Sequence, residues 1–180
     1  MPAIRFPAAL LVLLLTILAL PGCRTPHTMG DPTAAVLDRF VGRWETEALI
    51  RTPGPPAREV RTHGRAVCLR ALEGRYVEFR TSSLDPPGNA ELQIMTYDPE
   101  ARIYRQWVFD SEGYRHEALG RWDPATSTLR WEGRVDGATI VIDDRWVSAD
   151  RLEWTLARTA ADGRLVQTIQ GVVSRRRAGD

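Results

Sequence analysis

The chain has 180 residues, of which 43% are hydrophobic and 26% charged, proportions that are ordinary for a soluble globular protein. This length is sufficient for one domain with a substantial core. The 24 basic and 23 acidic residues leave a formal charge of +1, which gives no reason to expect nucleic acid or an anionic surface as a partner. All 24 basic residues are Arg, and the absence of Lys excludes Schiff-base or lysine-nucleophile chemistry.

The chain begins with the features of a secretory signal. Arg5 supplies a positive charge, and residues 6–20 form an apolar run shorter than the ~20 residues needed to cross a bilayer. The segment Leu20-Pro21-Gly22-Cys23 follows and resembles the lipobox of bacterial lipoproteins, in which the Cys is diacylated and becomes the first residue of the mature protein. The resemblance implies that Cys23 carries a lipid anchor and that the exported domain faces the periplasm or the cell exterior. The alternative is an ordinary signal peptide in which Cys23 is incidental.

These features divide the chain into a signal peptide at residues 1–22, a tether at 23–30 and one domain at 31–177. Cys68 is the one further Cys, so a lipidated Cys23 leaves it without a partner, and no disulfide framework is expected. We expect Cys68 to be a small apolar strand residue rather than a reactive thiol.

A short helix is predicted at the start of the domain. Asp31-Pro32 has the form of an N-cap followed by Pro at the first helical position. Val36 with Phe40, and Leu37 with Val41, are spaced i, i+4 and form one apolar stripe. We expect this helix to lie across one end of the domain and to end at Gly42.

After Gly42 the helical period disappears, and about ten strand-like segments follow, each bounded by turn residues such as Asp-Pro or Asp-Gly. The predicted strands cover residues 43–50, 59–71, 75–82, 91–97, 102–110, 114–122, 128–135, 138–147, 151–159 and 164–175. Gly64 interrupts the second of them and indicates a bulge. Tight turns without crossover helices predict an all-β fold, a single antiparallel up-and-down barrel closed at one end by the helix.

Alternation of apolar and polar residues assigns one face of each strand to the interior. The residues assigned to it are Val77, Phe79, Trp107, Phe109, Leu129, Trp131, Gly133, Val135, Ile140, Ile142, Leu152, Trp154 and Leu156. Each large apolar side chain stabilises the fold by about 1.5–3 kcal/mol when it is buried, so this face must be covered. A barrel of about ten strands encloses more space than side chains need fill, and the pattern therefore predicts an interior cavity.

Three polar residues, Arg105, His116 and Arg158, share the parity of the interior face. A buried Arg without a partner would lower the stability of the fold by several kcal/mol. One interpretation is a pocket in which an Arg or a His fixes the polar end of a ligand. The candidate ligand-binding residues are Arg105, Trp107, Tyr114, His116, Trp131 and Trp154. The alternative is that these positions reach solvent at strand ends, or that a bulge inverts the parity.

The sequence contains no recognisable catalytic or metal-binding motif. Its three His residues are far apart, and it has no Cys-x-x-Cys, G-x-S-x-G, P-loop or dinucleotide fingerprint. Asp143 and Asp144 are adjacent in a strand, so their side chains are expected on opposite faces rather than as a catalytic pair. We therefore expect a protein that is not an enzyme and that uses no metal or cofactor.

With Gly42-Arg43-Trp44 opening the first strand after a short helix, the domain resembles the calycin superfamily, which includes lipocalins and fatty-acid-binding barrels. The resemblance implies that Gly42 and Trp44 close one end of the barrel and that Arg175 or Arg176 stacks on the Trp44 ring. Residues 37–176 are also similar to a lipocalin-like bacterial domain family of unknown function. The segments that carry this similarity are F-V-G-R-W at 40–44, G-R-Y-V at 74–77 and T-Y-D-P at 96–99, followed by Tyr104 and Trp107. A shared fold does not imply a shared function.

Three functional hypotheses fit these features. The leading one is a lipid-anchored β-barrel without enzymatic activity that binds or carries a small apolar molecule in the cell envelope. The second is a structural or protein-interaction module whose barrel is filled by its own Trp and Leu side chains. The third is a haem-dependent enzyme using His116, because nitrobindin-type barrels share the architecture and bind haem through a His late in the chain. This sequence has no His after His116.

Overall fold

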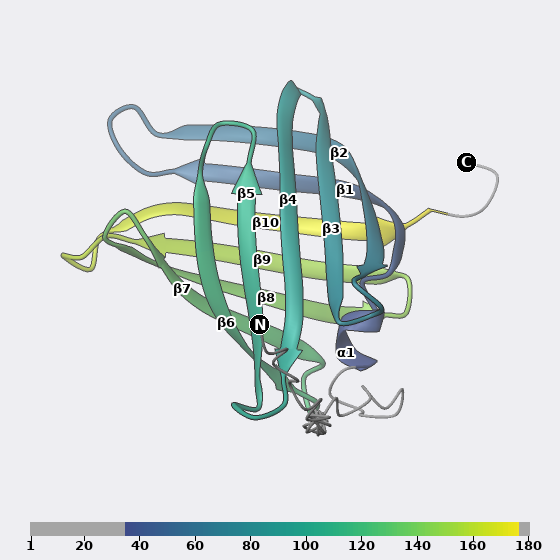
Figure 1. Cartoon of the computed structure of the whole chain (residues 1–180). Helices are drawn as coiled ribbons and strands as arrows, with labels where there is room; N and C mark the ends of the chain where they lie inside the picture. The colour runs from purple at the N-terminus through teal and green to yellow at the C-terminus, as the bar shows by residue number, and fades with distance from the viewer. Residues whose placement is uncertain (1–34, 177–180) are drawn as a thin grey trace, which may run out of the picture.

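The computed structural model describes residues 35–176, which form one short helix and ten strands (Figure 1). The elements are α1 (Ala35–Asp38), β1 (Gly42–Thr52), β2 (Arg58–Ala71), β3 (Tyr76–Asp85), β4 (Pro87–Asp98), β5 (Ile103–Asp110), β6 (Arg115–Asp123), β7 (Thr128–Val135), β8 (Ala138–Ser148), β9 (Arg151–Thr159) and β10 (Leu165–Arg175). The predicted signal peptide, the tether with Cys23 and the N-cap at Asp31-Pro32 lie outside the described residues.

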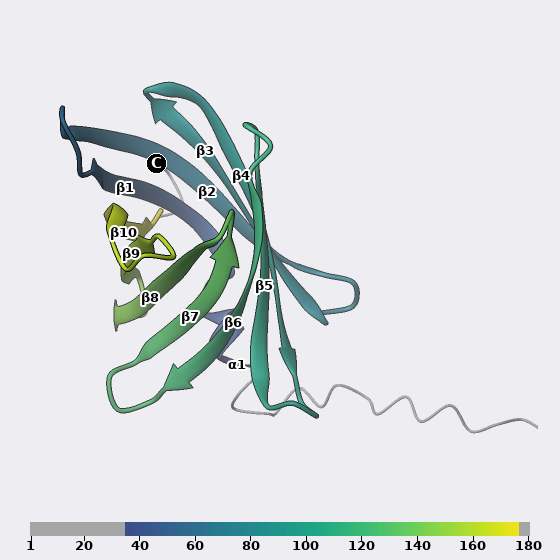
Figure 2. The same cartoon turned by 90° about the vertical axis from the view of Figure 1, so that its left-hand side faces the viewer.

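The strands close into a single antiparallel barrel. Each strand pairs with its neighbours in sequence, and β1 also pairs with β10, which removes both edges of the sheet. The turns alternate between two ends, and α1 lies at the end that also carries the β2–β3, β4–β5, β6–β7 and β8–β9 turns (Figures 1 and 2). We call this the α1 end and the opposite one the far end. The predicted up-and-down barrel of about ten strands with a short N-terminal helix is confirmed.

Two local features of the sheet are the length of the β3–β4 hairpin and a bulge in β2. The β3–β4 hairpin is longer than predicted, because Leu84 pairs with Pro87 across the turn. A register shift between His63 and Gly64 confirms the bulge predicted in the second strand. A Cβ atom at Gly64 would lie 2.6 Å from the Ser82 carbonyl oxygen, so the close approach of β3 at this point requires Gly.

The helix is shorter than predicted. It ends at Asp38, and the chain continues through turns in which the Phe40 N–H donates to the Leu37 carbonyl at 3.2 Å. Gly42 is already the first residue of β1, so the prediction that it ends the helix is wrong. Val36, Leu37 and Phe40 of the predicted stripe are nevertheless buried, and Val41 is half-buried. No helix in the described part of the chain combines the length and apolar character needed to cross a membrane.

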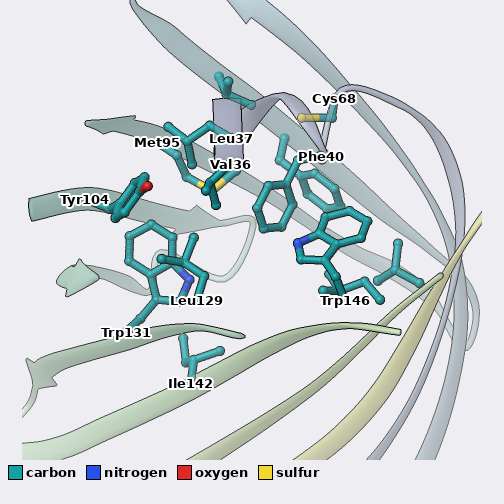
Figure 3. Close-up of a cluster of buried hydrophobic side chains, with 14 of the residues drawn as sticks. Val36, Leu37, Phe40, Cys68, Met95, Tyr104, Leu129, Trp131, Ile142 and Trp146 are labelled. Carbon is teal, nitrogen blue, oxygen red and sulfur yellow. The ribbon is translucent and has the colours of Figure 1, made fainter. Parts of the chain in front are cut away.

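Aromatic side chains fill the α1 end of the barrel, and we call Phe40, Trp44, Phe79 and Trp146 the floor. Figure 3 shows Phe40 and Trp146 next to each other. Trp44 is fully buried, and its indole Nε1 donates to the Phe40 carbonyl at 2.7 Å. The Phe40 ring packs edge-on against Trp146 and Phe79, with centroids 5.2 and 6.3 Å apart. Trp44 therefore closes this end of the barrel, as the resemblance to calycins implied.

Arg175 and Gly42 explain why the chain carries G-x-W at this position. The Arg175 guanidinium lies 4.1 Å from the centroid of the Trp44 ring and donates through Nη1 to the Val41 carbonyl at 2.9 Å. A Cβ atom at Gly42 would lie 2.2 Å from that Nη1, so Gly leaves the space that the cation occupies. The predicted stacking of an Arg from the last strand on Trp44 is confirmed for Arg175.

The predicted inward parity is confirmed on β3, β7, β8 and β9 and is wrong on β5. The buried residues of β5 are Tyr104, Gln106 and Val108, whereas Trp107 and Phe109 lie on the outer face. Both faces of this strand carry large apolar side chains, so alternation does not distinguish them. The strand register determines which face of β5 is inside, because Tyr104 pairs with the inward Gly120 of β6.

Candidate ligand-binding site

Beyond the floor the barrel encloses a cavity of about 270 Å³ that extends from Phe40 to Ser83 and Asn89 near the far end. Ligand pockets usually measure roughly 300–1,000 Å³, so this cavity suits a small ligand. The predicted interior cavity is present. The floor is filled by the protein's own aromatic rings, and the space beyond it is not.

One wall of the cavity is mainly apolar. It is built by inward residues of β1, β8, β9 and β10, which are Ala48, Ile50, Ile142, Leu152, Trp154, Leu156, Ile169 and Val173. The Trp154 indole lies against β10 at Gly171, where a Cβ atom would be 2.2 Å from Nε1. Gly171 therefore leaves the space that the Trp154 indole occupies on this wall.

The opposite wall, on β4 and β5, carries a chain of polar side chains. Gln106 Nε2 donates to Gln93 Oε1 at 2.7 Å, and Gln93 Nε2 donates to Glu91 Oε1 at 2.6 Å. The Glu91 carboxylate accepts at the far end and so orients both amides with their NH₂ groups towards it. Gln106 is 3% exposed, and its Oε1 is left buried with no hydrogen-bond partner among the described residues. Burial raises the pKa of the Glu91 carboxyl above its ordinary range.

His116 lies on β6 beside this wall and lines the cavity. Its ring stands at 62° to that of Tyr114, with centroids 5.4 Å apart. Both ring nitrogens are buried, and neither has a hydrogen-bond partner within residues 35–176. Burial lowers the pKa of His116 below its ordinary value, so the imidazole is neutral near pH 7 and offers one donor and one acceptor.

Asp144 places a carboxyl group inside the barrel, on the apolar wall. Its Oδ2 accepts a hydrogen bond from Trp131 Nε1 at 2.8 Å, and burial raises the pKa of the Asp144 carboxyl to about 7. Asp143 points the other way and pairs with Arg130 at 3.1 Å on the outer face. The prediction that the two Asp side chains face opposite sides is confirmed. Asp144 was not predicted as a site residue, although its parity with Ile140, Ile142 and Trp146 indicated an inward position.

The predicted site residues divide into three groups. Trp154 and His116 line the cavity, and Tyr114 contacts His116 towards the far end. Trp131 is fully buried and holds Asp144 rather than lining the cavity. Arg105 and Trp107 were assigned to the interior wrongly, because β5 has the opposite parity.

The outward position of Arg105 is stabilised by two carboxylates. Its guanidinium lies 3.4 Å from Asp98 Oδ2 and 3.3 Å from Glu117 Oε1, both on the outer surface. Arg158 does have the inward parity that was predicted. It lies near the far end, 3.6 Å from Asp136 Oδ2 and 5.9 Å from the centroid of the Tyr114 ring. No group of three or more His, Cys, Asp or Glu side chains in the described part of the chain converges as a metal site would.

Cys68 is expected to be unreactive in the folded protein. The residue is fully buried, and burial raises the pKa of its thiol to about 12, so the nucleophilic thiolate is scarce at pH 8. When residues 23–180 are produced with Cys23→Ser, a thiol reagent should label no Cys at pH 8 until denaturant is added. Complete labelling of the folded protein within seconds would contradict this burial.

A closed antiparallel barrel with a Trp-plugged end and an internal cavity is a calycin-like β-barrel. Residues 31–175 match the family described as protein of unknown function, DUF1579, and the chain belongs to this family. Its fold is similar to that of Rv2717c from M. tuberculosis, with a TM-score of 0.61 and 14% identity over 82% of this chain and 99% of that one. It is also similar to the S-type phycobiliprotein lyase CPES from Guillardia theta, with a TM-score of 0.55 and 11% identity over 80% of this chain and 92% of that one. No curated protein matches the chain.

Proposed function

We propose that this protein is a non-enzymatic binding protein of the bacterial cell envelope, anchored through a lipid on Cys23, that holds a small, largely apolar molecule inside its barrel. The observation that carries the proposal is a cavity that combines an apolar wall with buried polar atoms, Gln106 Oε1 and both His116 nitrogens, that have no hydrogen-bond partner among residues 35–176. An unsatisfied buried polar group costs about 1–3 kcal/mol, a cost that a bound molecule offsets by supplying the missing hydrogen bonds.

The second hypothesis, a barrel filled by its own side chains, fits only the floor. Phe40, Trp44 and Trp146 pack there ring against ring, which closes the α1 end without any ligand. Beyond them, Ala48 lines the cavity at a position where a larger residue would occupy it. A small residue at this position favours a barrel that keeps space for a guest.

Native mass spectrometry of the mature chain with Cys23→Ser, purified without detergent, tests the binding proposal. We expect a population with an additional small-molecule mass. Ala48→Phe, which adds a ring inside the cavity, should abolish that population, and Leu49→Phe on the outer face of the same strand should leave it unchanged. Equal occupancy in the two variants would place the molecule outside the barrel.

Metabolic labelling with an alkyne fatty acid tests the anchor. Expressed in bacteria, the full chain and its Cys68→Ser variant should both incorporate the label, and Cys23→Ser should not, because the acyl chains attach to Cys23. Equal labelling of Cys23→Ser and Cys68→Ser would contradict a lipid anchor at Cys23.

A further inference from the structure

We propose that the ligand of this barrel carries a protonated amine on its apolar body, with Asp144 as the counter-charge. This inference rests on the proposed function and names the chemical class of molecule that the cavity takes. Three features of the described residues carry it: the charges of the lining, the orientation of the Gln106–Gln93–Glu91 chain, and the position of Asp144 beside an aromatic face.

The cavity lining is rich in acceptors and poor in cations. Asp144 and Glu91 contribute carboxyl groups, while no Arg side chain lines the cavity within residues 35–176, and the sequence contains no Lys. The His116 imidazole is buried and neutral near pH 7, so it does not neutralise them. His63 also lines the cavity, and the inward Arg158 lies near the far end, 5.9 Å from the centroid of the Tyr114 ring. Asp144 is paired instead with Leu129 and Trp154 on its neighbouring strands, so among the described residues a cation finds a counter-charge at this point and an anion finds none.

The amide chain ends in an acceptor. Because Glu91 accepts from Gln93, and Gln93 in turn accepts from Gln106, the unpaired atom at the end of the chain is the carbonyl oxygen Gln106 Oε1. Only a hydrogen-bond donor satisfies this atom. The residue is 3% exposed, so bulk water does not reach it freely, and the ligand is the group that can supply the donor.

A cation near Asp144 would contact two groups, the Asp144 carboxyl group and the Trp154 ring. It pairs in register with Trp154 across β8 and β9, so both side chains project into the same part of the cavity. Trp131 Nε1 occupies one lone-pair position of Asp144, which leaves further acceptor capacity for a ligand N–H. The face of a Trp ring attracts ammonium groups, so Trp154 and Asp144 together favour a protonated amine. The apolar body would then lie on Ile142, Leu156 and Ile169.

Three probes with the same phenyl body and different heads test the inference: 2-phenylethylamine, 2-phenylethanol and 3-phenylpropionate. Their Kd values for the mature chain with Cys23→Ser are measured by ligand-observed NMR titration. We expect the amine to bind about 10-fold more tightly than the alcohol, as one hydrogen-bonded charge pair provides, and the carboxylate to bind most weakly. Asp144→Asn should remove the preference for the amine and leave the Kd of the alcohol within about twofold.

Asp143→Asn is the matched control, because it makes the same change at the neighbouring residue on the outer face and should leave all three Kd values unaltered. Glu91→Gln provides a second test of the acceptor wall and should weaken amine binding more than alcohol binding. If the alcohol or the carboxylate binds as tightly as the amine, the inference is wrong and the binding function stands. If none of the three probes binds, both the proposed binding function and the inference of an amine ligand are wrong.

Discussion

Replacing Trp44 by Ala is expected to lower the free energy of unfolding by about 3–5 kcal/mol, the range measured for large aromatic side chains removed from a packed core. Trp44 is fully buried, donates to the Phe40 carbonyl, and supplies the face on which Arg175 stacks. Its removal leaves a cavity in the floor, a buried carbonyl without a donor and a cation without its ring. Urea denaturation of residues 23–180 with Cys23→Ser measures the change.

Trp107→Ala is the control for this experiment. Trp107 lies on the outer face of β5, opposite in direction to the buried Gln106 and Val108, so its removal creates no internal cavity. We expect it to cost less than half as much as Trp44→Ala. A larger loss of stability for Trp107→Ala than for Trp44→Ala would mean that the parity of β5 or the position of the floor is wrong.

Asp144→Asn is expected to make the protein more stable at pH 8, by up to about 4 kcal/mol, and to flatten the dependence of its stability on pH. The folded-state pKa of Asp144 is raised to about 7 from an ordinary value of 3.8, because burial penalises the carboxylate. Between these two pH values the folded protein holds a proton that the unfolded chain has released. The stabilisation from Asp144 is therefore complete below about pH 4 and is lost as the pH rises through 7. Asn cannot ionise, and its carbonyl can still accept from Trp131 Nε1.

Urea denaturation at a series of pH values from 4 to 8 checks this prediction. The difference in unfolding free energy between Asp144→Asn and the parent should be small at pH 4 and should grow towards pH 8, with the Asn variant the more stable. Asp143→Asn removes an exposed pair with Arg130, worth about 0–1 kcal/mol, and the smaller repulsion that Asp143 exerts on Asp144, so its trend with pH should be much weaker. A constant difference across the whole range would contradict a buried, protonated Asp144.

The loss of stability that Asp144 causes at neutral pH also supports a role for this residue in binding. A carboxyl group that destabilises the fold at neutral pH, placed inside an apolar wall, is the kind of feature that persists where a binding site needs it. Asp144→Asn should therefore separate the two properties, raising stability while abolishing the preference for an amine.

The sequence predicted the barrel well, because turn residues recur at regular spacing and most strands have one apolar face. β7 illustrates this: Leu129, Trp131 and Val135 alternate with charged residues, and all three are buried. The two faces of β5 show no such contrast between apolar and charged residues. With Trp107 and Phe109 on one face and Tyr104 and Val108 on the other, only the pairing with β4 and β6 decides which face is inside.

The candidate site was predicted less completely than the fold, for a physical reason. Inward polar residues were recognised where they stood out, as at His116, but Gln93 and Gln106 acquire meaning only through a hydrogen bond between two strands. Asp144 was correctly expected to face away from Asp143, but it was not assigned to the site, because a single inward carboxyl group forms no recognisable motif. The space that Gly42 leaves for Arg175 joins residues at opposite ends of the domain, and no local pattern reveals it.

The most direct test of an interior site is methyl NMR of residues 23–180 with Cys23→Ser, in which the Ile, Leu and Val methyl groups are labelled. The protein is titrated with the neutral probe 2-phenylethanol. Ile142, Leu156 and Ile169 line the cavity, whereas Leu69, Leu119 and Val147 are 57%, 41% and 41% exposed. We predict saturable shifts at the first three methyl-bearing residues, with cross-relaxation to the phenyl protons, and none at the other three. Shifts confined to Leu69, Leu119 or Val147 would place the probe on the surface and contradict a binding site inside the barrel.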